Sequence, residues 1–320
     1  MTKFVSRLGN VGIAKEATAG TIVTPTFWVP FNSISFDDKT STAREMEGLG
    51  RIEDSDSSLV TNRYAEGDIE FDMNDYQIGL FLTSLLGASP TTAGGPTYTQ
   101  TYALTNTNTH KSLSIAYGDP DQYKIFPYCV IDGLEITVEP EGIAKAKASF
   151  KSRVSRDWAT LTPVYTTLGN KFLHQHLYFA LGANIAGLSG AANIPLKKLT
   201  LKFQANADFD NTTGTAEPKA ILNHQFSVEG EIVLNKTDDT YRQLMLNGTY
   251  KAMEITFNRA SNSKLQFQFP RVDFSEWEQD RKLDDIVGQK LKFKANYDAA
   301  NAYAAIYTCV LTNTYAGSNY

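Results

Sequence analysis

The chain has 320 residues, of which 42% are hydrophobic and 20% charged, a balance typical of a folded protein and not of a disordered one. Its formal net charge is −5 and no basic patch is visible, which argues against tight binding of nucleic acid, because such affinity comes mostly from neutralised phosphates. The two cysteines, Cys129 and Cys309, lie far apart in apolar runs, so we expect buried free thiols in a reducing cytoplasm. The sequence shows neither a signal core nor a run of membrane-spanning length, so we expect no membrane partner.

The first half of the chain predicts strands around one short helix. Residues 37–61 are acidic and without a regular period, so they predict a long loop. A strand follows up to residue 73, and a helix then begins at the N-cap residues Asn74 and Asp75 and ends at Gly87. A loop at 88–96 and a Thr/Asn-rich run to residue 110 lead to three strands, at 111–117, in the run 126–134 after its opening Phe-Pro, and at 143–150. Pro127, like Pro270 in the second half, is expected just before its strand, where it costs no ladder hydrogen bond.

The second half repeats this order. The Glu-Gly-acid-Ile sequence at 66–69 recurs at 229–232, an offset of 163 (229 − 66). It is preceded by another acidic loop, at 206–224, and followed by a helix that begins at Asp238 and Asp239 and ends at Gly248. Strands are then predicted at 251–257, 269–277, 290–297 and 303–312.

Five matches in the same order predict an internal duplication. The first copy spans 1–152, a linker spans 153–170, and the second copy spans 171–320 with an extra C-terminal strand. The predicted fold class is mainly β, of the α+β kind, with one short helix in each copy.

Motifs for catalysis and for cofactors are missing from the sequence. It contains no Gly-rich phosphate loop, no nucleophile elbow and no zinc-site spacing. His174 and His176 form the one histidine pair, spaced to point one way from a strand, and two ligands are too few for a structural zinc site. We therefore predict no catalytic, cofactor-binding or metal-binding residue, and no enzyme.

Two charged segments have both a structural and a functional interpretation. Asp68, Glu70 and Asp72 alternate with apolar residues, so one face of their strand is acidic. A solvated face explains them better than a glycosidase site does. The run 275–286 carries both signs and is either a solvent-facing turn or a subunit-contact loop with reciprocal salt bridges. The candidate contact residues in this run are Glu276, Glu278, Asp280 and Arg281.

Several further runs carry a family resemblance. They are Gly12 to Phe31, with its Thr-Pro-Thr-Phe-Trp-Val-Pro-Phe ending; Gly50-Arg-Ile-Glu-Asp-Ser-Asp56; Tyr64-Ala-Glu-Gly67; Gly79-Leu-Phe-Leu82; Asn223-His-Gln-Phe-Ser-Val-Glu-Gly230; the helix from Tyr241 to Gly248; and Val310-Leu-Thr-Asn-Thr314. In this order they resemble the tail-tube proteins of long-tailed bacteriophages. The similarity covers nearly the whole chain.

The resemblance implies a fold and a role. Each copy would be a β-sandwich or half-barrel domain flanked by its helix, and six such domains would form a ring around a lumen. Two domains per chain then imply a ring of three chains, although a ring of six whole chains stays open. Stacked rings would form the tail tube of the virion, through which DNA passes without specific binding. Partners implied are further copies of the chain and the tape-measure, tail-terminator and tail-tip proteins.

Two sets of positions are assigned roles within such a tube. A lining that repels DNA should be neutral or acidic, which makes the acidic strand face the candidate lumen surface. The candidate lumen residues are Asp68, Glu70, Asp72, Glu229 and Glu231. The acidic segments 37–61 and 206–224 are the candidate contacts between rings, expected to order on stacking.

Three alternatives remain open at this stage. The first is the tube of a contractile injection system, which the duplication disfavours because such tubes usually have one shorter domain per chain. The second is a carbohydrate-binding or surface-binding β-sandwich, adhesin-like, in which exposed Tyr and Trp would serve. An enzyme is the third, and the missing catalytic residues argue against it.

Overall fold

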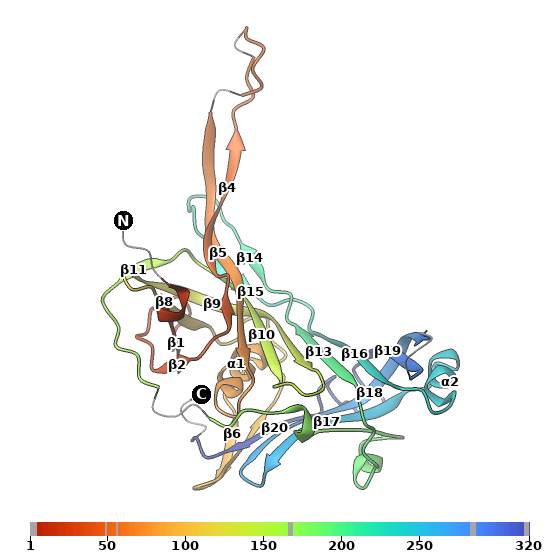
Figure 1. Ribbon diagram of the computed structural model, residues 1–320. Coiled ribbons are helices and arrows are strands. Elements are labelled where there is room, and N and C mark those ends of the chain that lie inside the picture. The colour runs from red at the N-terminus through yellow and green to blue at the C-terminus, as the bar shows by residue number, and fades with distance from the viewer. Residues whose placement is uncertain (1–4, 49, 56, 166–168, 282–285, 317–319) are drawn as a thin grey trace.

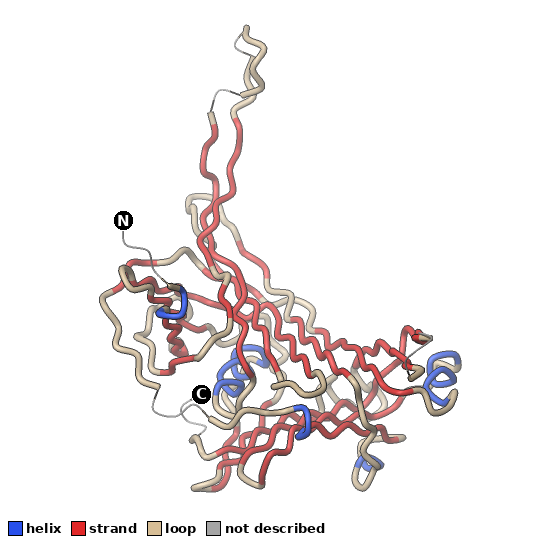
Figure 2. Tube along the Cα trace, in the orientation of Figure 1, coloured by secondary structure: helices blue, strands red, loops and turns tan. Residues whose placement is uncertain are grey.

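The computed structural model describes residues 5–48, 50–55, 57–165, 169–281, 286–316 and 320. The protein is mainly β, as predicted, and its described part contains two short α-helices and three 3-10 turns. Figure 2 shows a broad sheeted body and one long hairpin arm that leaves it. Within the described residues, no helix combines the length and the apolar character needed to span a membrane.

The first half contains β1 to β11 and the helix α1. Their bounds are β1 Asn10–Lys15, β2 Phe27–Val29, β3 Ser33–Ile34, β4 Asp37–Arg44, β5 Ser58–Asp72, α1 Gln77–Leu86, β6 Thr91–Gly94, β7 Tyr98–Tyr102, β8 Leu113–Gly118, β9 Tyr123–Val138, β10 Lys145–Ser152 and β11 Arg156–Trp158. The second half contains β12 to β20 and the helix α2. Their bounds are β12 Leu177–Gly182, β13 Lys198–Gln204, β14 Asp208–Asp210, β15 Ala220–Leu222, β16 Ser227–Asn235, α2 Thr240–Leu246, β17 Lys251–Ala260, β18 Ser263–Asp280, β19 Gly288–Ala295 and β20 Thr308–Asn313.

Strand pairing follows the same order in the two halves. In the first half the antiparallel neighbours run β1–β8–β9–β10–β5–β3, with β4 continuing along β5. In the second half they run β12–β17–β18–β19–β16–β13. The helix follows the equivalent strand each time. Helix α1 comes after β5, and the β6–β7 hairpin separates it from β8, whereas α2 comes after β16 and leads directly to β17. The boundaries 1–152, 153–170 and 171–320 remain a prediction, and β11 within the linker pairs with β9.

Two β-bulges recur at matching positions in β9 and β18. Pro127 lies in a register shift of β9 against β8, and Pro270 lies in a register shift of β18 against β17. Further along, the extra residue opposite β10 is Asp132 and the extra residue opposite β19 is Ser275. Both matches have the same offset, 143 (270 − 127 and 275 − 132). The expectation that Pro precedes these strands is therefore wrong: each Pro lies inside its strand, at a bulge, where a missing N–H removes no regular ladder bond.

One ladder joins the two halves into a continuous sheet. The second part of β9 pairs with β10 of its own half and, on its other side, with β13 of the second half, from Leu199 opposite Val138 to Gln204 opposite Gly133. The sheet therefore runs β5, β10, β9, β13, β16, β19, β18. In Figure 1 the labels β10, β13, β16 and β19 follow one another across the molecule. A second connection pairs β20 with β7.

The apolar core lies on one side of this sheet. Leu134, Leu201 and Phe293 point into it and are at most 2% exposed, and all ten residues of α1 are buried against the same side. Asn74 starts α1, since its Oδ1 accepts hydrogen bonds from the backbone N–H groups of Tyr76 and Gln77. Gly87 ends the helix with a left-handed φ of 87°.

The three segments predicted as loops contain strands. Most of 37–61 belongs to the β4–β5 hairpin, which forms the arm in Figure 1. The region after α1 holds the β6–β7 hairpin, and 206–224 holds the small β14–β15 hairpin. Seven of the eight β4 residues are exposed, so these strands rest on hydrogen-bond pairing and leave no apolar alternation in the sequence.

Candidate functional site

The outer face of the continuous sheet carries charges whose sign alternates from strand to strand. Because side chains alternate between the two faces of a strand, the positions opposite the apolar core share this outer face. Acidic residues occupy β5, β9, β16 and β18, and lysines occupy β10, β13 and β19 between them. The lysines are Lys145, Lys147, Lys151, Lys198, Lys202, Lys290, Lys292 and Lys294. This alternation depends on which strands pair with which across the whole sheet, and no local sequence pattern specifies that pairing.

The predicted lumen residues of the first half all lie on this outer face. Asp68 is bonded to the ammonium of Lys147 at 2.9 Å and to the hydroxyl of Ser149 at 2.6 Å. Burial would raise the pKa of the Asp68 carboxyl, but the hydroxyl and the ammonium together hold that pKa below its usual value. Glu70 accepts a hydrogen bond from the Ser33 hydroxyl at 2.9 Å.

Asp72 lies at the end of the same row. Its carboxylate meets Lys171 Nζ at 2.6 Å and the amide of Asn32 at 2.9 Å. Burial opposes the ionisation of Asp72, yet the Lys171 ammonium and the Asn32 amide lower its pKa. Lys171 belongs to the second half of the chain, so this pair also crosses between the halves.

The two predicted lumen residues of the second half have lysine partners on β19. Glu229 lies 2.7 Å from Lys294 Nζ, and Glu231 lies 3.0 Å from Lys290 Nζ. Between the halves, Lys202 meets Glu135 at 3.1 Å. The outer face is therefore a lattice of cross-strand ion pairs and not an acidic strip. The carboxylates were predictable from the sequence; their lysine partners were not predicted, although the alternating Lys in 143–150 and 290–297 was the available signal.

Three of the four candidate subunit-contact residues lie in a strand and not in a turn. Glu276 and Glu278 belong to β18, where they meet Lys292 at 2.6 Å and Lys290 at 3.9 Å. Asp280 ends the strand, and Arg281 follows it and donates to the side chain of Gln279 at 2.9 Å. Residues 282–285 of the predicted contact segment lie outside the described residues.

Both ends of the continuous sheet are open. Among the described residues, the side of β18 away from β19 has no strand partner from Asp273 to Glu278, and β3 and β4 have none on the side away from β5. Unpaired strand edges of this kind are templates for pairing with another chain.

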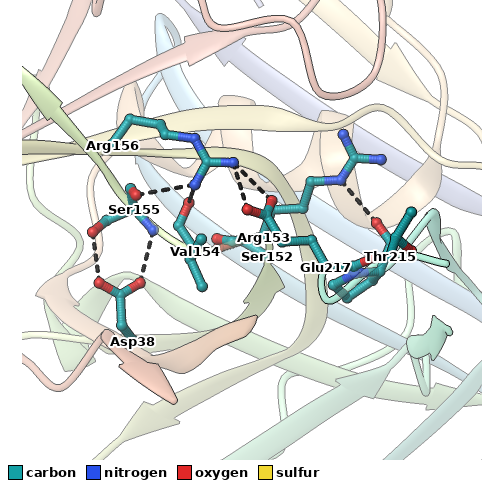
Figure 3. Close-up of polar contacts among 9 residues, drawn as sticks. Asp38, Ser152, Arg153, Val154, Ser155, Arg156, Thr215 and Glu217 are labelled. Atoms are coloured by element: carbon teal, nitrogen blue, oxygen red, sulfur yellow. Dashed lines mark hydrogen bonds and ion pairs between the residues drawn. The ribbon is translucent and has the colours of Figure 1, made fainter. Parts of the chain in front are cut away.

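A polar network braces the base of the arm (Figure 3). Asp38 on β4 accepts hydrogen bonds from the backbone N–H and the hydroxyl of Ser155, at 2.7 and 2.6 Å. Next along the chain, Nη2 of Arg156 donates to both carboxylate oxygens of Glu217 at 2.7 Å, while its Nη1 donates to the carbonyl oxygens of Val154 and Ser155. Arg153 donates to the carbonyl oxygen atoms of Pro218 and Lys219. Segment 153–156 thus ties the arm to the 206–224 segment, which packs on the first half.

The histidine pair does not lie on a strand. His174 and His176 fall in a 3-10 turn, where the His176 ring accepts a hydrogen bond from the Leu173 N–H and burial lowers the His176 pKa. In the described part of the chain, no group of three or more His, Cys, Asp or Glu side chains is placed to hold a metal ion. Cys129 and Cys309 are both buried free thiols, and burial raises the pKa of each.

A repeated sheet unit, open edges at both ends and a charge-balanced outer face define a structural protein built for assembly. A comparison with known families agrees with this class. The model of the family described as phage tail tube protein matches residues 6–300, so the chain belongs to that family. The resemblance seen in the sequence is thereby confirmed, and the chain is a component of a phage tail. No curated protein matches the chain.

Proposed function

We propose that three copies of this chain close into a ring, and that stacked rings form the tube through which phage DNA leaves the virion. The observation that carries this proposal is the continuous sheet, in whose described part β18 from Asp273 to Glu278 and β3–β4 each have one strand edge without a partner strand. The two ends differ, so they associate head to tail, and such contacts give a closed ring when the rotation per chain divides a full turn. Membership of a structural tail-tube family supports a non-enzymatic role.

Barrel geometry favours three chains. Each chain supplies eight strands to the sheet, counting β3 with β4 as one: β3/β4, β5, β10, β9, β13, β16, β19 and β18. Three chains give 24 strands (3 × 8), and with a spacing of about 4.8 Å and a tilt of about 40° the barrel is about 48 Å across between backbones. Side chains of about 5 Å on each side leave a lumen of roughly 40 Å, which admits a DNA duplex. Six chains would give a barrel about twice as wide.

The outer, charged face of the sheet is the proposed lumen surface, since the other face packs on α1 and the core. DNA binds a surface by replacing its counterions with protein cations. Here the lysines already face carboxylates, as Lys147 faces Asp68 and Lys294 faces Glu229. A duplex therefore finds few uncompensated cations to hold it, and it slides past.

The β4–β5 arm is the proposed contact between rings, because it extends well beyond the sheet that would form the barrel wall. Its tip exposes Met46, Ile52 and Leu59, at 73%, 101% and 53%. Large apolar side chains on an extended arm are suited to docking on another subunit. At the ends of the tube the same surfaces would meet the tape-measure, tail-terminator and tail-tip proteins.

Native mass spectrometry and negative-stain electron microscopy of concentrated protein test the proposal. We expect a species of three chains, and rings or short tubes with a stain-filled centre. A ring of six chains would overturn the stoichiometry, and a protein that stays monomeric at all concentrations would overturn ring formation by the chain itself.

A further inference from the structure

We infer that the β18 edge of one chain pairs with the β3–β4 edge of the next chain, antiparallel, with Asp37 opposite Glu278. The inference rests on the proposed ring and assigns the strands and the register of its subunit contact. The junction between the two halves of one chain, the ladder between β9 and β13, serves as its template.

The β9–β13 ladder can serve as a template for the contact between chains because each of its two strands corresponds to a strand at an open edge of the sheet. Strand β9 corresponds to β18 with the offset of 143 fixed by the two shared bulges. Strand β13 corresponds to β3 and β4 with an offset of 165, because Ile34 lies opposite Ile69 of β5 just as Leu199 lies opposite Ile232 of β16. In the first half β9 already pairs with β13, whereas among the described residues the stretch of β18 from Asp273 to Glu278 has no strand at the equivalent edge.

The register of the contact follows from these two offsets. Within the chain, Lys202 lies opposite Glu135. Subtracting 165 from the first position and adding 143 to the second places Asp37 opposite Glu278. The same arithmetic converts the pair of Gln204 and Gly133 into Lys39 opposite Glu276.

The burial of the two helices supports a missing neighbour at the β18 end. Helix α1 packs near β9, at the junction of the halves, and none of its ten residues is exposed. Helix α2 packs in the same way near β18, but none of its residues is buried and Leu246 is 56% exposed. Figure 1 shows α2 at the free end of the sheet. In the inferred contact, the next chain would lie beside α2 in the position that the second half of the same chain occupies beside α1.

Charge agrees with the register at one pair and opposes it at the other. Strand β18 is acidic, so the alternation calls for a basic strand next, and Lys39 supplies a cation opposite Glu276. Asp37 instead meets Glu278, a like-charge pair that weakens the contact.

The substitution Asp37→Lys recreates the internal pair of Lys202 and Glu135, which are 3.1 Å apart. We expect it to lower the concentration for half-assembly by roughly three- to tenfold, whereas Asp121→Lys, an equal charge change in the exposed β8–β9 turn, leaves that concentration unchanged.

Disulfide trapping tests the register directly. In a chain carrying Asp37→Cys and Glu278→Cys, oxidation should link neighbouring chains, because directly opposed Cβ atoms lie about 4.5–5.5 Å apart and a small shift brings them to disulfide distance. On a non-reducing gel we expect a ladder that ends at three chains. The register control combines Asp37→Cys with Gln279→Cys, whose side chain points to the other face, and should stay unlinked. The native cysteines are buried and do not interfere.

The outcomes separate this inference from the proposed function. Trimeric rings by native mass spectrometry without the 37–278 link, or with the 37–279 link in its place, overturn the register and leave the ring intact. If no oligomer forms in the wild type or in Asp37→Lys, the ring proposal fails together with this contact.

Discussion

At the scale of single residues, the charged face makes the stability of the chain depend on pH. Asp68 and Asp72 have pKa values below the ordinary 3.8, owing to their hydroxyl, amide and ammonium partners. A carboxyl with a depressed folded-state pKa stabilises the fold above its unfolded-state pKa, and this contribution is lost as pH falls through the folded-state value. We expect the free energy of unfolding in urea to fall between pH 6 and pH 3, and to fall less in Asp68→Asn. Ser149→Ala, which removes the hydroxyl donor, should show an intermediate decrease; equal pH dependence in all three proteins would contradict the assignment.

At the scale of elements, the brace at the base of the arm should control local motion more than global stability. Arg156 and Glu217 are partly exposed, at 44% and 29%, and surface ion pairs contribute at most about 1 kcal/mol. Arg156→Lys keeps the charge but has a single nitrogen, so it cannot keep both the Glu217 pair and the bonds to the carbonyl oxygens of Val154 and Ser155. We expect hydrogen exchange measured by mass spectrometry to rise in 215–222 with little change in melting temperature.

The matched control for this element is Arg44→Lys. Arg44 makes a single contact of 3.5 Å with Asp54 on the arm, so its replacement should leave exchange in 215–222 unchanged. Exchange that is the same in Arg156→Lys and in the wild type would show that the pair does not hold the 206–224 segment.

The elements differ in how far the sequence predicts them: the ends of α1 are predictable, whereas strand β4 and the pairing of β9 with β13 are not. The Asn74 start and Gly87 end of α1 follow from local hydrogen bonding and from a left-handed φ, so they were predictable. The β4 strand was missed because its residues are exposed on both faces and no apolar period marks it. The pairing of β9 with β13 joins positions more than 60 residues apart (199 − 138 = 61), and only the folded chain specifies it. The lysine partners of Asp68 and Glu229 depend on two further long-range registers, those of β10 with β5 and of β19 with β16.

At the scale of the whole molecule, the sheet acts as a charge-compensated wall. Its acidic and basic strands alternate within one chain, and the proposed contact continues the order across the chain boundary through Lys39 and Glu276. The ion pairs set register, because a slip of one residue would move the charged side chains to the core face. If this face lines the tube, as proposed, the same pairs leave the lining without the excess of cations that would retain DNA.

The lining role is tested by reversing charge on one strand. Lysine at Asp68, Glu70 and Asp72 places a basic β5 beside the basic β10, so the ring gains 18 units of positive charge on its lumen face (three sites, two units each, three chains). We expect rings to form, DNA to bind with a steep inverse dependence on salt, and ejection from virions carrying the variant to slow. The control carries lysine at Glu45, Glu47 and Glu53, an equal charge change on the exposed arm. DNA binding that rises equally in both variants would reflect net charge alone, whereas loss of rings in the first variant without DNA binding would place these three carboxylates at a subunit contact and not in the lumen.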